Sequence, residues 1–117
     1  MASKEDLAKE YAARIKKGYA EDATTLGGRQ YSNTKRAIRS VQSDIDGLTY
    51  SNTQPKQIIN DEDKIYIYKK IIDELGEKDV VIIGEIITEQ VQKAASIDDT
   101  SELVNYISVL MQQGGKK

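Results

Sequence analysis

The 117-residue sequence contains no histidine, cysteine, tryptophan or phenylalanine, so its seven aromatic residues are all tyrosine. Histidine is the side chain that most often transfers protons near neutral pH, and cysteine and histidine are the common zinc ligands. A histidine-dependent hydrolase, a thiol enzyme or a zinc site therefore has no reagents here. We expect a chain that is not an enzyme, with no catalytic residues, no metal site and no cofactor.

Long apolar runs are missing as well. No segment approaches the roughly 18 apolar residues that a membrane span needs. The N-terminal segment is charged from Lys4 onward and has no apolar stretch of the kind found in a signal peptide. Together with the absence of cysteine, these features favour a cytoplasmic protein that does not contact a membrane.

The apolar residues that are present recur at helical spacing, and the length suits one domain covering residues 1–117. We expect its ends, residues 1–2 and 114–117, to be flexible. A first helix should begin near Ser3, because Leu7, Tyr11, Ile15 and Tyr19 follow at intervals of four. Further helices are expected from about residue 33, from 60 to 75 and from 100 to 113. With residues 79–95 these make about five helices, and we predict an all-α compact bundle.

Residues 79–95 are the ambiguous segment. The run Val80 to Ile83 is β-branched throughout, which is typical of a buried strand. However, Val80, Ile83, Ile87 and Val91 also fit one face of a helix. We expect helix over most of the segment, with a short extended stretch at residues 80–82. Gly84 is expected at a place where two helices pack closely.

The C-terminal half, residues 62–113, has the order helix, short β-branched segment, helix, turn, helix. That order resembles a helix-turn-helix or winged-helix core. The helix that would enter DNA opens with Asp98, Asp99 and Glu102, which would repel phosphates. If such a core forms, we expect it to serve protein contact, or DNA to be contacted by residues 29–39 instead.

Charge is distributed unevenly along the chain. Residues 1–40 contain nine Lys/Arg and five Asp/Glu, a net of +4, whereas residues 41–117 contain eight and fourteen, a net of −6. The basic excess is densest in segment 29–39, where a tyrosine accompanies four cations, and such a stretch can contact a nucleic-acid backbone and stack on a base. It can equally be a solvated helix face. The candidate nucleic-acid contacts are Arg29, Tyr31, Lys35, Arg36 and Arg39.

Two apolar segments are candidate protein interfaces. One is a seam of heptad type on the second expected helix, and the other is the run 80–87. Each can instead be the core of the chain itself. The candidate interface residues are Ile38, Val41, Ile45, Leu48, Val81, Ile82 and Ile86.

These features predict a small non-enzymatic helical module that binds another protein in a regulatory role and that can also form a homo-oligomer. The alternative is a nucleic-acid-binding regulator that uses the basic segment 29–39.

Overall fold

A computed structural model describes residues 4–24, 31–49, 61–94, 97 and 99–115 of the chain. These residues form five helices: α1 (Lys4–Thr24), α2 (Ser32–Thr49), α3 (Asp61–Leu75), α4 (Glu77–Ala94) and α5 (Ser101–Gly115). The predicted all-α bundle of about five helices is confirmed. None of the helices in the described residues is both long and apolar enough to cross a membrane.

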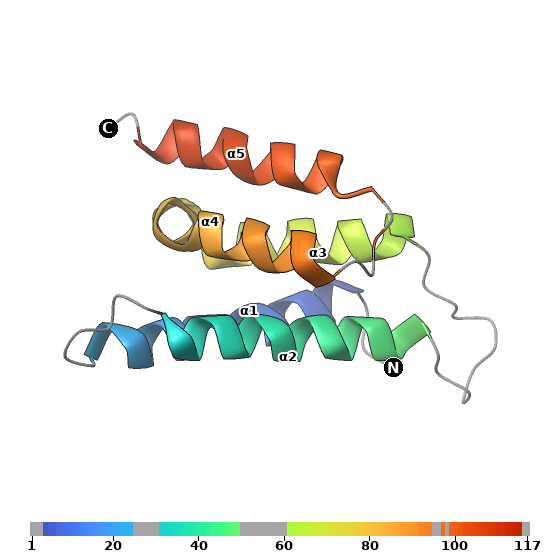
Figure 1. The fold of residues 1–117 in the computed structure, drawn as a ribbon, viewed down its shortest axis with the longest axis horizontal. Helices are drawn as coiled ribbons and strands as arrows, with labels where there is room; N and C mark the ends of the chain where they lie inside the picture. Colours follow the sequence, from blue (N-terminus) through green and yellow to red (C-terminus); the bar gives the residue numbers. More distant parts are fainter. Residues whose placement is uncertain (1–3, 25–30, 50–60, 95–96, 98, 116–117) are drawn as a thin grey trace.

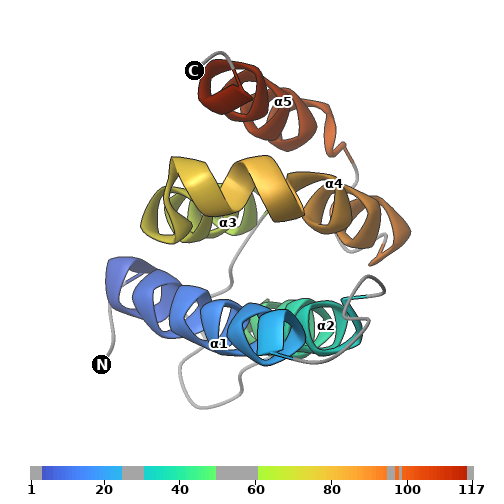
Figure 2. The same cartoon turned by 90° about the vertical axis from the view of Figure 1, so that its left-hand side faces the viewer.

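The helices stack in three layers. Helices α1 and α2 lie side by side in the first layer, α3 and α4 form the middle layer, and α5 lies on the outside of the middle layer (Figures 1 and 2). Helix α4 consequently has α2 on one side and α5 on the other. This position gives α4 two flanking furrows, one of which is the candidate site described below.

Isoleucine dominates the core, which draws on every helix. Because the buried positions recur every three or four residues, each helix presents one apolar face to its neighbours. The fully buried large side chains are Ile38, Val41, Ile45, Ile67, Ile72, Val80, Ile83, Leu103 and Ile107, together with Thr34. On α3, Ile67 is fully buried, whereas Ile65 is only partly buried.

The expected extended stretch at residues 80–82 is wrong, because α4 is one helix from Glu77 to Ala94. Val80, Ile83 and Ile87 are all buried on one side of it, so packing outweighs the preference of β-branched residues for strands. The short β-branched segment in the resemblance to a winged-helix core is therefore absent. Gly84 does lie at a close contact, where the side chain of Met111 from α5 packs over it.

Helix α5 continues to Gly115 rather than ending at residue 113 as expected, and α2 extends through Gly47 to Thr49. Helix α3 ends as predicted before Gly76, which has a φ of 88°, a conformation that favours glycine. The expected helix starts at Ser3 and Asn60 lie outside the described residues.

Helices α1 and α2 approach each other at Gly18. A Cβ atom built on Gly18 would lie 2.7 Å from the backbone oxygen of Asn33 and 3.2 Å from the Cβ of Ala37. Only a residue without a side chain allows this separation of the two backbones. The close contact fixes the start of α2 against α1.

Candidate functional site

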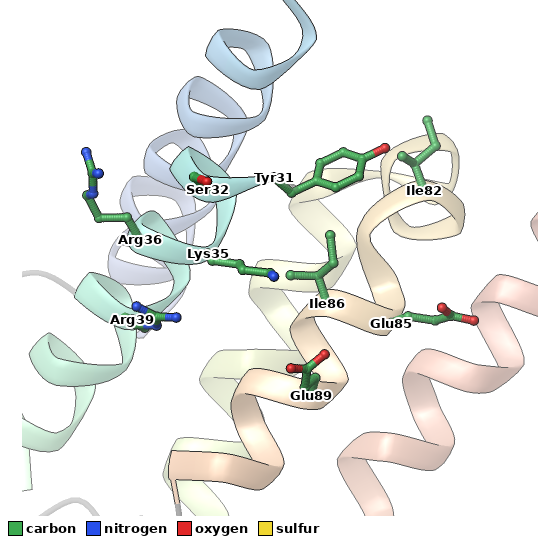
Figure 3. Close-up of a pocket in the computed structure, with 9 residues that line it drawn as sticks. All are labelled: Tyr31, Ser32, Lys35, Arg36, Arg39, Ile82, Glu85, Ile86 and Glu89. Atoms are coloured by element: carbon green, nitrogen blue, oxygen red, sulfur yellow. The ribbon is translucent and has the colours of Figure 1, made fainter. Parts of the chain in front are cut away.

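A groove of about 590 Å³ runs between α2 and α4. Its α2 wall consists of residues spaced one helical turn apart, and its α4 wall does the same, so both walls are straight rows (Figure 3). Tyr31 extends toward Ile82 at one end of the groove, and Lys35 extends toward Ile86 (Figure 3). The lining residues are Tyr31, Ser32, Lys35, Arg36, Arg39, Ile82, Glu85, Ile86 and Glu89.

Hydrogen bonds to Gln90 close the other end of the groove. Gln42 Nε2 donates to the backbone oxygen of Gln90 at 2.9 Å, and Arg39 Nε donates to Gln90 Oε1 at 3.3 Å. Both glutamines are buried, so these bonds satisfy polar groups that would be costly to bury alone. They hold α2 and α4 in a fixed register, in which residues 31, 35 and 39 face residues 82, 86 and 90.

The two walls carry opposite charge. Lys35, Arg36 and Arg39 are on α2, whereas Glu85 and Glu89 are on α4. Of the three cations, Arg36 points away from α4 (Figure 3). Between the charged rows lies an apolar strip defined by Ile82 and Ile86, and Ile82 is 47% exposed.

Glu89 on the acidic wall forms an ion pair with a residue of its own helix. Lys93 Nζ lies 2.8 Å from Glu89 Oε1, one helical turn away. This hydrogen bond, the charge of Lys93 and, more weakly, the charge of Lys35 lower the pKa of Glu89. Glu89 is therefore ionised at neutral pH. Glu85 points toward α5 (Figure 3) and also borders the second furrow, between α4 and α5.

The start of α2 is held by a residue of α1. The Asp22 carboxylate accepts hydrogen bonds from the backbone N–H of Asn33 at 3.0 Å, from the backbone N–H of Thr34 at 2.8 Å and from Thr34 Oγ1 at 2.6 Å. The first N–H groups of a helix have no partner within the helix, and a carboxylate there is also favoured by the helix dipole. Asp22 thus caps α2 from a neighbouring helix.

Burial and hydrogen bonding shift the pKa of Asp22 in opposite directions. This side chain is only 5% exposed. Burial raises the pKa of this carboxyl, but the hydrogen bonds from Thr34 and Asn33 together lower it by a larger amount. The pKa of Asp22 therefore lies below its ordinary value. Asp22 was not among the functional residues predicted from the sequence. A signal was present, because Asp22 follows Ile15 and Gly18 on the buried face of α1.

Tyr31, which directly precedes α2, has an unusual backbone. Its φ is 51°, in the left-handed region that non-glycine residues rarely adopt. Its ring stacks on that of Tyr19 from α1, with centroids 6.4 Å apart and planes inclined by 10°. The stacking and the adjacent cap hold Tyr31 at the mouth of the groove despite a strain that typically costs about 1–3 kcal/mol.

Of the candidate nucleic-acid contacts, four lie together on the α2 side of the groove. They are Tyr31, Lys35, Arg36 and Arg39, while Arg29 lies outside the described residues. Their row is thus one wall of a groove whose other wall is acidic.

The candidate interface residues divide into two groups. Ile38, Val41 and Ile45 are at most 2% exposed and belong to the core of the chain, so they offer no contact surface on the folded chain. The side chain of Leu48 lies outside the described part. On α4, Val81 is half-buried close to Gly114 of α5, whereas Ile82 and Ile86 line the groove.

A second polar cluster lies between α2 and α3, and its residues do not line the groove. Lys64 Nζ is 3.6 Å from Asp46 Oδ1, and Tyr68 is buried beside them. Burial, reinforced by the charge of Asp46, raises the pKa of Tyr68, which keeps this phenol protonated near neutral pH. The cluster therefore links two helices and supplies no activated base through Tyr68.

No family model, curated protein or solved structure matches this chain. The groove must be interpreted from its own chemistry.

Proposed function

We propose that this chain is a non-enzymatic helical module that binds another protein through the groove between α2 and α4. The observation that supports the proposal is an apolar strip, made of the exposed Ile82 and the half-buried Ile86, that is flanked by rows of opposite charge. Exposed apolar area rimmed by polar groups is typical of protein contact surfaces. A regulatory role and a cytoplasmic location belong to the same proposal, because they fit a binding module and a chain without cysteine.

The shape of the groove specifies the kind of partner segment. Its two walls are straight rows of one-turn spacing, so a helix whose apolar stripe lies over Ile82 and Ile86 fits along it. Such a helix needs acidic residues over Lys35 and Arg39 and basic residues over Glu85 and Glu89. Opposite charges placed this way set the orientation of the partner and speed its association.

Nucleic-acid binding is the second candidate, because Lys35, Arg36 and Arg39 place three cations within two turns of α2. The carboxylates of Glu85 and Glu89 across the groove oppose it, since a phosphate backbone in the groove would meet both rows. A gel shift with duplex and single-stranded DNA and RNA at low salt tests this candidate. Retention at low salt that weakens steeply with added salt would support it, because each neutralised phosphate adds to the salt dependence.

The protein-binding proposal is tested by placing a photo-crosslinking amino acid at Ile82 of the full chain. The matched control has the same amino acid at Val109 on α5, because Val109 is 43% exposed and apolar but lies outside the groove. After illumination in an extract of the native cells, we expect a discrete protein adduct from position 82 that is absent from position 109. Equal labelling at both positions, or none at position 82, would contradict the proposal.

A further inference from the structure

The surface around the groove is self-complementary in charge. Along the groove, the α2 row is basic and the α4 row is acidic, with the apolar strip of Ile82 and Ile86 on the acidic side. A partner that fits must carry the reverse order, with acid over the basic row and base over the acidic row. A second copy of this chain presents that order when it is turned by 180° about an axis parallel to the groove.

The direction of the two-fold axis decides whether opposite or like charges face each other across the contact. A two-fold axis along the groove exchanges left and right, so the basic row of each copy faces the acidic row of the other. A two-fold axis across the groove would place like rows together, which costs binding free energy. Only the first arrangement satisfies the charges, and it does so twice because the contact is symmetric.

The apolar residues are consistent with the same arrangement. Ile82 is about half exposed and Tyr31 is half-buried at the open end of the groove. A symmetric contact covers both copies of each residue. At the closed end, Gln42 and Gln90 are hydrogen bonded to each other. These groups already have partners within the chain, so we expect this end to keep its geometry in the dimer.

We propose that the partner that covers the groove is a second copy of this chain, in a two-fold symmetric dimer whose α2 row of Lys35 and Arg39 faces the α4 row of Glu85 and Glu89 of the partner copy. This inference rests on the proposed function, since it names the protein that the groove binds. A different protein or a nucleic acid would be an outcome of the test that overturns it.

The test starts with sedimentation analysis of the full chain over a wide concentration range. The mass should rise from the 13.1 kDa of one chain toward twice that value. Two charge-reversed variants follow: Lys35→Glu with Arg39→Glu, and Glu85→Lys with Glu89→Lys. Each variant alone opposes like charges in both halves of the contact, so we expect its dimer dissociation constant to rise by about tenfold or more.

The mixture of the two variants is the decisive arm. In a mixed pair, the reversed α2 row of one variant faces the reversed α4 row of the other, and the two unreversed rows face each other as well. Both halves are again attractive, so the equimolar mixture should form a heterodimer at concentrations where each variant alone is a single chain. Lys9→Glu with Lys16→Glu on α1 changes the net charge as the α2 variant does, at exposed positions outside the groove, and should dimerise like the wild type.

Circular dichroism and urea unfolding of each variant identify any loss of folding, and recovery in the mixture requires that both variants are folded. A wild type that remains at 13.1 kDa throughout, or a mixture that does not associate, overturns the dimer. If the Ile82 probe then still yields an adduct with another protein, the proposed function stands and only the identity of the partner is wrong. If that adduct is missing too, both fail.

Discussion

Replacement of Asp22 provides the sharpest test of how the groove is positioned, because this carboxylate holds the start of α2. Asp22→Ala removes the acceptor for three hydrogen bonds at a site that is 5% exposed. Loss of a cap costs about 1–2 kcal/mol, and leaving the buried Thr34 hydroxyl without a partner costs about 1 kcal/mol more. We expect the free energy of unfolding to fall by about 2–3 kcal/mol for Asp22→Ala.

Asp22→Asn removes the charge of the cap but keeps its shape. One oxygen remains to accept from Thr34, but the amide NH₂ then meets the N–H of Asn33, so roughly half of the loss, about 1.5 kcal/mol, is expected. Glu21→Gln is the matched control, because Glu21 is the neighbouring acidic residue and is exposed. Its effect should stay within about 0.5 kcal/mol. Urea unfolding followed by circular dichroism at one fixed protein concentration measures all three.

The pH dependence of the same variants gives an independent check. Since the folded-state pKa of Asp22 lies below its ordinary value of 3.8, the ionised carboxylate stabilises the fold fully above that value. The contribution is lost as the pH falls through the lower pKa of the folded state. The difference in stability between the wild type and Asp22→Asn should therefore be constant near neutral pH and shrink below about pH 4. An Asp22→Asn variant within 0.5 kcal/mol of the wild type, or a difference that does not change in acid, would refute the cap.

Two further pairs of substitutions test packing. Gly18→Ala places a Cβ 2.7 Å from the Asn33 carbonyl and should lower the midpoint of thermal unfolding, at a cost of about 1–3 kcal/mol, whereas Gly47→Ala has nothing within 4 Å and should raise stability by up to about 1 kcal/mol. Changes in stability of the same sign for Gly18→Ala and Gly47→Ala would contradict the close approach of α1 and α2. Ile45→Ala in the core should cost about 2–5 kcal/mol in urea unfolding. Ile82→Ala should lower the free energy of unfolding by less than about 1 kcal/mol yet weaken dimerisation. A larger loss of stability for Ile82→Ala than for Ile45→Ala, with dimerisation unchanged, would place the interface elsewhere.

Helix content could be predicted from the sequence because apolar residues recur with helical period. The pattern Val80, Ile83, Ile87 and Val91 contained the correct answer for α4, and all four residues are buried in the structure. The expected extended stretch failed because local β-branched composition was given weight that tertiary burial overrides. Periodicity therefore proved a better guide than propensity in this segment.

The Asp22 cap was not predicted because its partners lie 11 and 12 residues further along the chain, on another helix. A carboxylate near a helix end is usually a surface charge. What distinguishes Asp22 is its place on the buried face of α1, and that face becomes visible only when Gly18 is counted as part of the contact stripe. Buried glycines thus extend a helix face that hydrophobicity alone would end too early.

The groove could not be predicted as a site, because its two walls come from segments that the sequence presents separately. The basic segment around Lys35 suggested nucleic acid, and the apolar run around Ile82 suggested protein. The fold places them on opposite walls of one groove. The two hypotheses therefore concern the same surface, and binding of one partner there would exclude the other.

This overlap changes which experiment can separate them. A dimer held by two facing pairs of charged rows weakens with added salt, as a phosphate complex does, so salt dependence alone does not distinguish protein from nucleic acid. The acidic row does distinguish them. Glu85→Lys with Glu89→Lys enlarges the cationic surface and should strengthen binding to nucleic acid, whereas it should break the homodimer. Opposite responses of one variant to the two partners follow directly from carboxylates lying across the groove from Lys35 and Arg39.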